Sequence, residues 1–188
     1  AIGGGLELPD YMPGVRSTSF WAMGVLALVN GTVFASFVFA YFYLAYMSGA
    51  WPPPGSVVQD GWHDAGVMLS LLASGTLIML ASGALKRAHA RLCCFSIVVG
   101  AALLALAFWI QCEAARGADP TAHAFGATVW VMIAWQGLHV LLVFVMAAYC
   151  VVRQVAGRLD AARRVTFDNT WLMSLYTVAQ GLLVAFIV

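Results

Sequence analysis

The chain has 188 residues, of which 63% are hydrophobic and only 9% are charged, and its mean hydropathy is +0.90. Because soluble domains carry about 25% charged residues, this composition excludes a soluble globular protein and indicates an integral membrane protein. The formal net charge of +1 gives no indication of a nucleic-acid partner.

Five apolar stretches are long enough to cross a membrane, since a spanning helix needs about 20 predominantly apolar residues. The predicted spans, in chain order, are residues 19–49, 65–85, 92–112, 124–152 and 168–188. At a rise of about 1.5 Å per residue the first and fourth exceed a hydrocarbon core of about 30 Å, so we expect them to tilt or protrude. Because unpaired backbone groups find no water in lipid, the predicted fold is an all-α bundle of five transmembrane helices, forming one domain over residues 19–188.

The distribution of basic residues predicts the orientation of this bundle. Eight of the nine lie before the first span or in the connections between spans 2 and 3 and between spans 4 and 5. They are Arg16, Lys86, Arg87, Arg91, Arg153, Arg158, Arg163 and Arg164. The opposite side has Arg116 alone. Since cytoplasmic loops carry an excess of Lys and Arg, the N-terminus and segment 1–18 are predicted to be cytoplasmic and the C-terminus to lie outside.

The first span ends in a run of aromatic residues and prolines, FVFAYFYLAYMSGAWPPPG, over residues 37–55. Tyr and Trp concentrate at membrane–water interfaces, and proline cannot continue a helix because it lacks an N–H donor. The run is therefore interpreted as an interfacial belt and packing surface that ends the span. Its candidate contact residues are Phe37, Tyr41, Tyr43 and Trp51.

Residues that hold metals or cofactors are sparse. The four cysteines, none of them in a C-x-x-C pair, are Cys93, Cys94, Cys112 and Cys150. A zinc or iron–sulfur site needs about four converging ligands, so the cysteines are predicted to be small hydrophobic filler. His139 is the histidine well inside a predicted span, and a haem held by two histidines would need a second one at that depth. We therefore expect no cofactor, metal or catalytic centre in this chain.

Polar residues within membrane spans are functional hypotheses by default. Asn30 and Gln136 are neutral amides and are predicted to hydrogen-bond between helices. Gln111 and Glu113 lie at the end of the third span, with Glu113 at the outer interface. His139 is interpreted as a hydrogen-bonded packing residue, and a proton relay or a lipid-headgroup contact is the alternative.

Small residues recur on the second span at helical spacing. Gly66, Ser70 and Ser74 repeat every four residues, and Ser82 lies two turns beyond. Small residues let membrane helices approach closely. This pattern predicts intimate contact, either within the bundle or with a neighbouring subunit.

Several motifs occur in the order found in one known family. They are NGTVFASFVFAYFYL followed by AWPPPG, then SGALKRAHARL, GAALLALAFWIQCEA and AFGATVWVMIAWQGLHV, with FDNTWLMSLYTVAQGLLV as a weaker match at the end. Over about residues 20–155 the chain resembles subunit III of the haem–copper terminal oxidases, the cytochrome c oxidase family. The resemblance is to the five-helix bacterial form, including subunit III portions fused behind subunit I.

The chain departs from the pattern of this family at three places. Asn30 stands where many relatives carry a membrane-buried Glu. Gln136-x-x-His139 replaces a His-x-x-His, and residues 176–178, Tyr-Thr-Val, replace the Trp-His-Phe of the last helix.

The resemblance implies a non-catalytic accessory subunit of a proton-pumping oxidase, which reduces dioxygen to water in aerobic respiration. The family's seven-helix form has its N-terminus inside and its C-terminus outside, and five helices without the first two keep that orientation. It implies a bacterial cytoplasmic membrane, with haem and copper in partner subunits I and II and with phospholipid contacts. The chain would stabilise subunit I and support proton uptake. Cytochrome c or a quinol as electron donor, and membership of a larger respiratory supercomplex, stay open.

Two other classes of function remain as alternatives. A small transporter or channel predicts flux by the chain alone and a central polar pathway. A free-standing membrane enzyme predicts a bound cofactor or a converging set of ionisable residues. If the chain is an oxidase subunit, the candidate structural, lipid or subunit contacts are Phe37, Tyr41, Tyr43, Trp51, Gln111, Glu113, Gln136 and His139.

Overall fold

The computed structural model describes residues 17–54 and 61–188. The helices are α1 (Thr18–Met47), α2 (Gly61–Lys86), α3 (Ala90–Ala114), α4 (Ala124–Val155) and α5 (Val165–Ile187), with a short 3₁₀ turn, η1 (Ala115–Gly117), after α3. Within these described ranges, five helices are long and apolar enough to cross a membrane. The prediction of an all-helical chain with five candidate spans is therefore confirmed. Residues 1–16 of the predicted N-terminal segment and Gly55 of the proline turn lie outside the described residues.

Local signals in the sequence explain where α1 begins and ends. Ser17 is its N-cap, and the Ser17 hydroxyl accepts a hydrogen bond from the backbone N–H of Phe20 at 3.2 Å. Such a cap satisfies a donor that the first helical turn leaves unpaired. At the other end, the backbone N–H of Ser48 donates to the carbonyl of Leu44 at 3.0 Å. The helix therefore stops shortly before the Trp-Pro-Pro-Pro stretch.

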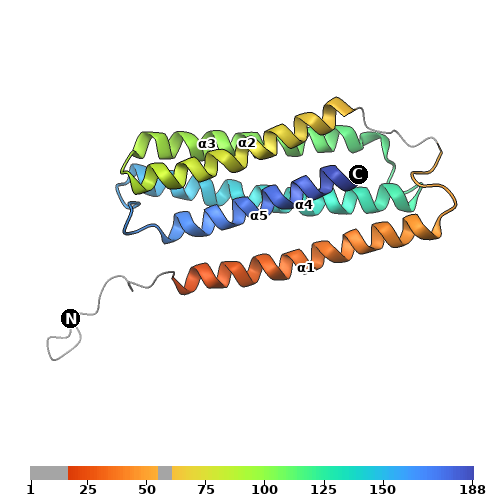
Figure 1. Cartoon of the computed structure of the whole chain (residues 1–188), viewed down its shortest axis with the longest axis horizontal. Coiled ribbons are helices and arrows are strands. Elements are labelled where there is room, and N and C mark those ends of the chain that lie inside the picture. Colours follow the sequence, from red (N-terminus) through yellow and green to blue (C-terminus); the bar gives the residue numbers. More distant parts are fainter. Residues whose placement is uncertain (1–16, 55–60) are drawn as a thin grey trace.

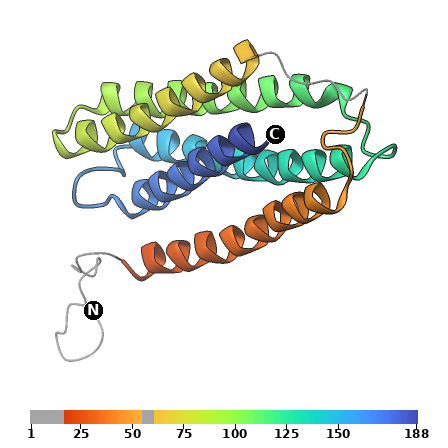
Figure 2. The same ribbon diagram turned by 45° about the vertical axis from the view of Figure 1, so that its right-hand side comes forward.

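The helices form three layers (Figures 1 and 2). α2 and α3 pack on each other, α4 and α5 make the middle layer, and α1 lies on the far side of α4 and α5. Contacts of α2 with α5 and of α3 with α4 join the first two layers. Within the described residues, α1 packs against α4 and α5 but not against α2 or α3. The first helix thus has a single packed side, from which Phe20, Phe34 and Tyr41 are buried.

The small-residue pattern on α2 marks its contact with α3. The Ser74 hydroxyl donates to the carbonyl of Gly100 at 2.7 Å. A side chain at Gly66 would lie 3.7 Å from Ile110. The prediction of close helix approach is confirmed. Of the two contacts considered, within the bundle or with a neighbouring subunit, the structure shows the one within the bundle.

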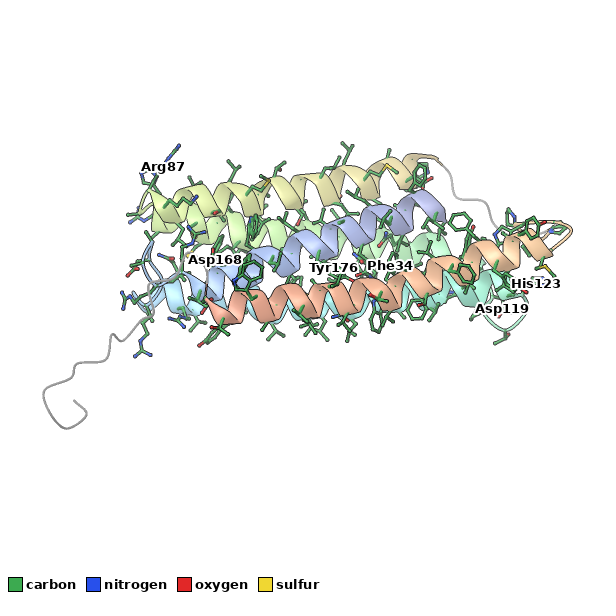
Figure 3. The ribbon with its side chains drawn as sticks, turned by 60° about the horizontal axis from the view of Figure 1, so that its bottom comes forward. Phe34, Arg87, Asp119, His123, Asp168 and Tyr176 are labelled. Atoms are coloured by element: carbon green, nitrogen blue, oxygen red, sulfur yellow. The ribbon has the colours of Figure 1, made fainter. Side chains whose placement is uncertain are left out.

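Charge is distributed unequally between the two ends of the bundle. The α2–α3 and α4–α5 connections and the start of α1 share one end, where Figure 3 shows Arg87 and Asp168, while Asp119 and His123 lie at the other. Two ion pairs order the α4–α5 connection: Arg163 with Asp160 and Arg164 with Asp168, each at 2.6 Å. This asymmetry is the basis of the predicted orientation, which stays a prediction.

The α2–α3 and α4–α5 connections lie at the end of the bundle that is rich in Lys and Arg, here called the basic end. Each connection contains a residue in the left-handed backbone region. Gly157 has φ +67° after α4, and Ala88 has φ +58° after α2. In each case the following N–H closes the helix end: Arg158 donates to the carbonyl of Arg153 at 2.8 Å, and His89 donates to that of Ala84 at 2.9 Å. Glycine is the usual residue at this position because it has no Cβ, so Ala88 is the less favourable of the two.

Candidate functional site

Part of the aromatic run on α1 faces the bundle. Tyr41 is 6% exposed. Its ring centroid lies 5.2 Å from that of Trp51 and 6.3 Å from that of Phe125, and the Trp51 and Phe125 centroids are 5.3 Å apart. Phe37, one turn earlier, meets the edge of Trp135 at 5.7 Å. These rings fasten the C-terminal end of α1 and the following turn to α4.

The remaining rings of the run face away from the bundle. Tyr43 is 54% exposed and stacks on Phe39 at 6.2 Å with an interplanar angle of 20°. Phe42 and Tyr46 are also exposed. The candidate contact residues therefore divide into two groups. Phe37, Tyr41 and Trp51 hold α1 to its own chain, and Tyr43 belongs to a surface open to lipid or to another subunit.

Two of the candidate amides join neighbouring helices in the interior. Gln136 on α4 is 1% exposed, and its Nε2 donates to the carbonyl of Thr177 on α5 at 3.1 Å. Gln111 on α3 is 5% exposed, and its Nε2 donates to the carbonyl of Gly181 on α5 at 3.2 Å. The interhelical role predicted for Gln136 agrees with this bond. Both amides use backbone acceptors on the same helix.

The third predicted interior residue, His139, is fully buried beside two aromatic rings. Its Nδ1 lies 2.7 Å from the carbonyl oxygen of Trp135. Because a carbonyl only accepts, this contact assigns the proton of a neutral imidazole to Nδ1. The His139 ring lies 5.3 Å from that of Trp135 and 5.2 Å from that of Tyr176 on α5. The geometry fits the packing interpretation, and a histidine with no exposed surface is not placed to touch a lipid headgroup.

Asn30 does not make the interhelical bond that was predicted for it. Its Nδ2 donates to the carbonyl of Leu26, four residues earlier in α1, at 2.8 Å. The reason is its place on a helix that packs on one side only. A partly exposed amide there finds its own helix as the nearest acceptor.

Glu113 lies at the end of α3, away from the basic end of the bundle. It pairs with Arg116 at 2.9 Å, and the two side chains are 30% and 68% exposed. In the loop that follows, Asp119 accepts hydrogen bonds from the N–H and hydroxyl of Thr121, both at 2.8 Å. The backbone bond, followed by the hydroxyl, holds the pKa of Asp119 below its usual value. These contacts order the loop, and Trp130 Nε1 ties it to α4 through the carbonyl of Ala118 at 2.7 Å.

The cysteines are dispersed and unpaired. All four are free, and the Cys150 sulfur contacts the Thr170 hydroxyl at 3.1 Å. Among the described residues, no three His, Cys, Asp or Glu side chains come together in a way that would hold a metal ion. The expectation that haem and copper belong to partner subunits stays a prediction.

Sequence reasoning missed several residues that complete these clusters. Phe125 and Trp135 receive the α1 rings, and Tyr176 lies against His139. Gln180 on α5 is a third buried amide, 3% exposed. The criterion that selected Gln111, a polar residue within an apolar span, would have found it. The rings carry no such signal, since an aromatic residue in a span is ordinary.

The chain is similar in sequence to a subunit of cytochrome c oxidase. It is 26% identical over 144 residues to cytochrome c oxidase subunit 3 of Oenothera berteroana, and the match covers 70% of this chain and 54% of that protein. The chain thus spans about half the length of the curated relative that it matches. No family model matches it. The five candidate spans and this similarity together support a multi-pass membrane protein that is similar to an oxidase subunit.

Proposed function

We propose that this chain is the accessory subunit III of a proton-pumping haem–copper terminal oxidase in a bacterial cytoplasmic membrane. In this role it carries no catalytic centre of its own. It packs against subunit I, shields that subunit from lipid and supports sustained proton uptake. Haem and copper would be held by subunits I and II.

The observation that carries this proposal is the similarity to cytochrome c oxidase subunit 3 over 70% of the chain. The ordered sequence motifs support it, and each lies on a helix of this chain: the aromatic run ends α1, and the WQGLHV motif lies in the middle of α4. The distribution of charge also supports it, since the excess of basic residues at one end agrees with a cytoplasmic N-terminus.

The division of α1 into a packed and an open side indicates how a partner would be contacted. The open side presents Phe39, Phe42, Tyr43 and Tyr46 near the outer end of the helix. Aromatic side chains are enriched in the buried centres of protein interfaces. In the proposed complex this side would contact a partner subunit or phospholipid, while Tyr41 and Trp51 hold the helix in place.

Purification through a tag on this chain, in a gentle detergent, tests the proposal. A reduced-minus-oxidised spectrum and mass spectrometry of the purified material are the two measurements. Haem bands together with oxidase subunits I and II are the expected result, and the haem type would narrow the class of oxidase. A folded, colourless chain without those subunits would overturn the proposal.

The alternative of a small transporter or channel is separated by a second measurement. Among the described residues, the buried polar set contains hydroxyls, amides and His139, without any Asp, Glu, Lys or Arg. Purified chain reconstituted alone into liposomes should then show no more ion flux than empty liposomes. Substantial flux from the isolated chain would favour transport over the accessory role.

A further inference from the structure

Three buried glutamines come from three different helices, and two of them hydrogen-bond to the backbone of α5 within one helical turn of the third. Gln111 comes from α3, Gln136 from α4 and Gln180 from α5, and they are 5%, 1% and 3% exposed. A buried amide carries two N–H donors and a carbonyl acceptor. Burial without partners for these groups is unfavourable, especially where the surroundings are apolar.

The hydrogen bonds of two of these amides fix their orientation. Gln111 donates from Nε2 to the carbonyl of Gly181, and Gln136 donates from Nε2 to the carbonyl of Thr177. Since a backbone carbonyl cannot donate, the contacting atom of each amide is its nitrogen. The Oε1 atoms of Gln111 and Gln136 have no hydrogen-bond partner among the described residues, and neither amide atom of Gln180 has one.

The backbone of α5 brings these groups to one level of the bundle. The accepting carbonyls of Thr177 and Gly181 are one helical turn apart, and Gln180 lies between them in the sequence. A side chain at position 181 would place its Cβ 2.7 Å from Gln136 Nε2. The lack of a side chain at Gly181 therefore lets the α4 amide lie against the backbone of α5.

The unpartnered atoms require a ligand that both donates and accepts. Three carbonyl oxygens call for donors, and the Gln180 N–H groups call for an acceptor. A metal cation would leave those N–H groups unpaired, and the described buried residues include no carboxylate to offset its charge. Water meets both requirements, and buried water typically makes about three hydrogen bonds to such groups.

We propose that Gln111, Gln136 and Gln180 form a binding site for buried water at the junction of α3, α4 and α5. About one turn before Thr177 in α5, a cavity of about 10 Å³ adjoins Ser174 of α5 and Ser74 of α2. That volume suits a single water molecule. Internal hydration of the bundle would thus be concentrated along the polar side of α5. The proposal is independent of the oxidase assignment, because the site lies within this chain.

A structure of the full chain, in its native complex or in lipid nanodiscs, at a resolution that shows ordered water tests the site. Density within hydrogen-bond distance of Gln180 and of Gln136 Oε1 is the expected result. Gln180→Met keeps the side-chain length and removes both unpartnered atoms, so this density should be lost. The control is Asn30→Leu on α1, whose amide nitrogen donates within its own helix to the carbonyl of Leu26; this variant should leave the density unchanged.

Infrared spectra recorded in ordinary water and in H₂¹⁸O, and then subtracted, give a second measurement on the same samples. Wild type and Asn30→Leu should show an isotope-sensitive O–H band of buried water that Gln180→Met lacks. A wild-type map in which the amides pair directly with each other, without intervening density, would overturn the proposal. So would density with the coordination of a cation. If Gln180→Met fails to fold, the wild-type map and spectrum still decide whether water occupies the site.

Discussion

The rings of Tyr41 and Trp51 meet edge to face, with their centroids 5.2 Å apart and an interplanar angle of 81°. Both rings also contact Phe125 on α4. This three-ring cluster joins the C-terminal end of α1, the turn that follows it and the start of α4. It is a large part of what holds that end of α1 to the bundle, because among the described helices α1 packs against α4 and α5 alone.

The first prediction separates the two sides of the aromatic run. Tyr41→Leu removes ring contacts worth about 0.5–1.5 kcal/mol each, so we expect the free energy of unfolding to fall by roughly 1–3 kcal/mol. Tyr43→Leu, at an exposed position, should change it by less than about 0.5 kcal/mol. Denaturant titration of the purified chain in mixed micelles measures both. Equal losses would contradict the assignment of the two sides.

For assembly with partner subunits, the exposed position is expected to matter more than the buried one. Tyr43→Leu, combined with Phe39→Leu, alters the open side of α1 and should lower the amount of co-purifying partner subunits or the duration of turnover. Tyr41→Leu should affect them only through stability. Unchanged assembly and sustained turnover in the double variant would remove the open side from the proposed interface.

A second prediction concerns the close approach of α4 and α5. In Gly181→Ala the new methyl group would lie 2.7 Å from Gln136 Nε2 and 3.0 Å from Leu71. Overpacking of this kind costs about 1–3 kcal/mol, and the same loss of stability is expected here. Gly24→Ala on α1 is the control, since nothing lies within 4 Å of its added Cβ. A stability of Gly181→Ala equal to that of the control would show that the Gln136 and Leu71 side chains can move aside at little cost.

Exchanging residues at the two left-handed positions should shift stability in opposite directions. Gly157→Ala places a Cβ at φ +67°, and Ala88→Gly removes one at φ +58°. Because a non-glycine residue in this region costs roughly 1–2 kcal/mol, the first variant should lose about 1 kcal/mol and the second should gain a similar amount. Thermal unfolding of both variants tests this. A change of the same sign in both would be inconsistent with the backbone explanation.

The connection between α4 and α5 should be sensitive to acid through Asp160. Hydrogen bonds from the Arg163 side chain, followed by its backbone N–H, hold the pKa of the Asp160 carboxyl below its usual 3.8. A lowered pKa in the folded state means that the stabilisation is complete above the unfolded value of about 3.9 and is lost as the pH falls through the folded pKa.

The stability difference between wild type and Asp160→Asn is the quantity to follow. It should be constant above about pH 5 and should shrink as the pH falls below about 4. Thermal midpoints of the two proteins, measured in one detergent across this range, give the difference directly. A difference that stays unchanged down to the lowest pH would show that the Arg163 contact does not depend on the carboxylate.

The orientation is tested by labelling single cysteines on opposite ends of the bundle. Ala122→Cys and Ala161→Cys place exposed thiols at the α3–α4 end and at the basic end of the bundle, in a background without Cys93, Cys94, Cys112 and Cys150. A membrane-impermeant maleimide added to intact cells should label position 122 and not position 161. After the membrane is opened, both should react. The reverse pattern would invert the topology.

The existence of the five spans follows from sequence because length and apolarity alone decide it. The start of α2 shows that apolarity does not predict where a helix begins. Apolarity predicts a span from residue 65, whereas the helix begins at Gly61 and carries Trp62, His63 and Asp64 in its first turn. Polar residues continue a helix beyond the hydrocarbon core, where water satisfies the backbone and apolarity no longer marks the boundary.

In each interior contact, the sequence identifies the amide donor but not its acceptor, for a chemical reason. Gln111 and Gln136 stand out as amides in apolar spans, but their acceptors are the carbonyls of Gly181 and Thr177. Every residue has a backbone carbonyl, so sequence does not mark these partners. The opposite exposure of Tyr41 and Tyr43 was hidden for a similar reason, because α1 is apolar all round and no polar face indicates which side packs.

The isolation of α1 from α2 and α3 has a consequence for how the molecule is made. A ribosome delivers the chain from its N-terminal end, and domains generally fold in that order. Within the described residues, however, α1 packs against α4 and α5 and not against α2 or α3, and both of its partners emerge after α2 and α3. While α2 and α3 can pair as soon as they enter the membrane, α1 must wait in lipid until α4 has been inserted. Its docking is therefore expected to follow the pairing of α2 with α3, and the Tyr41–Trp51–Phe125 cluster forms only when Phe125 of α4 has arrived.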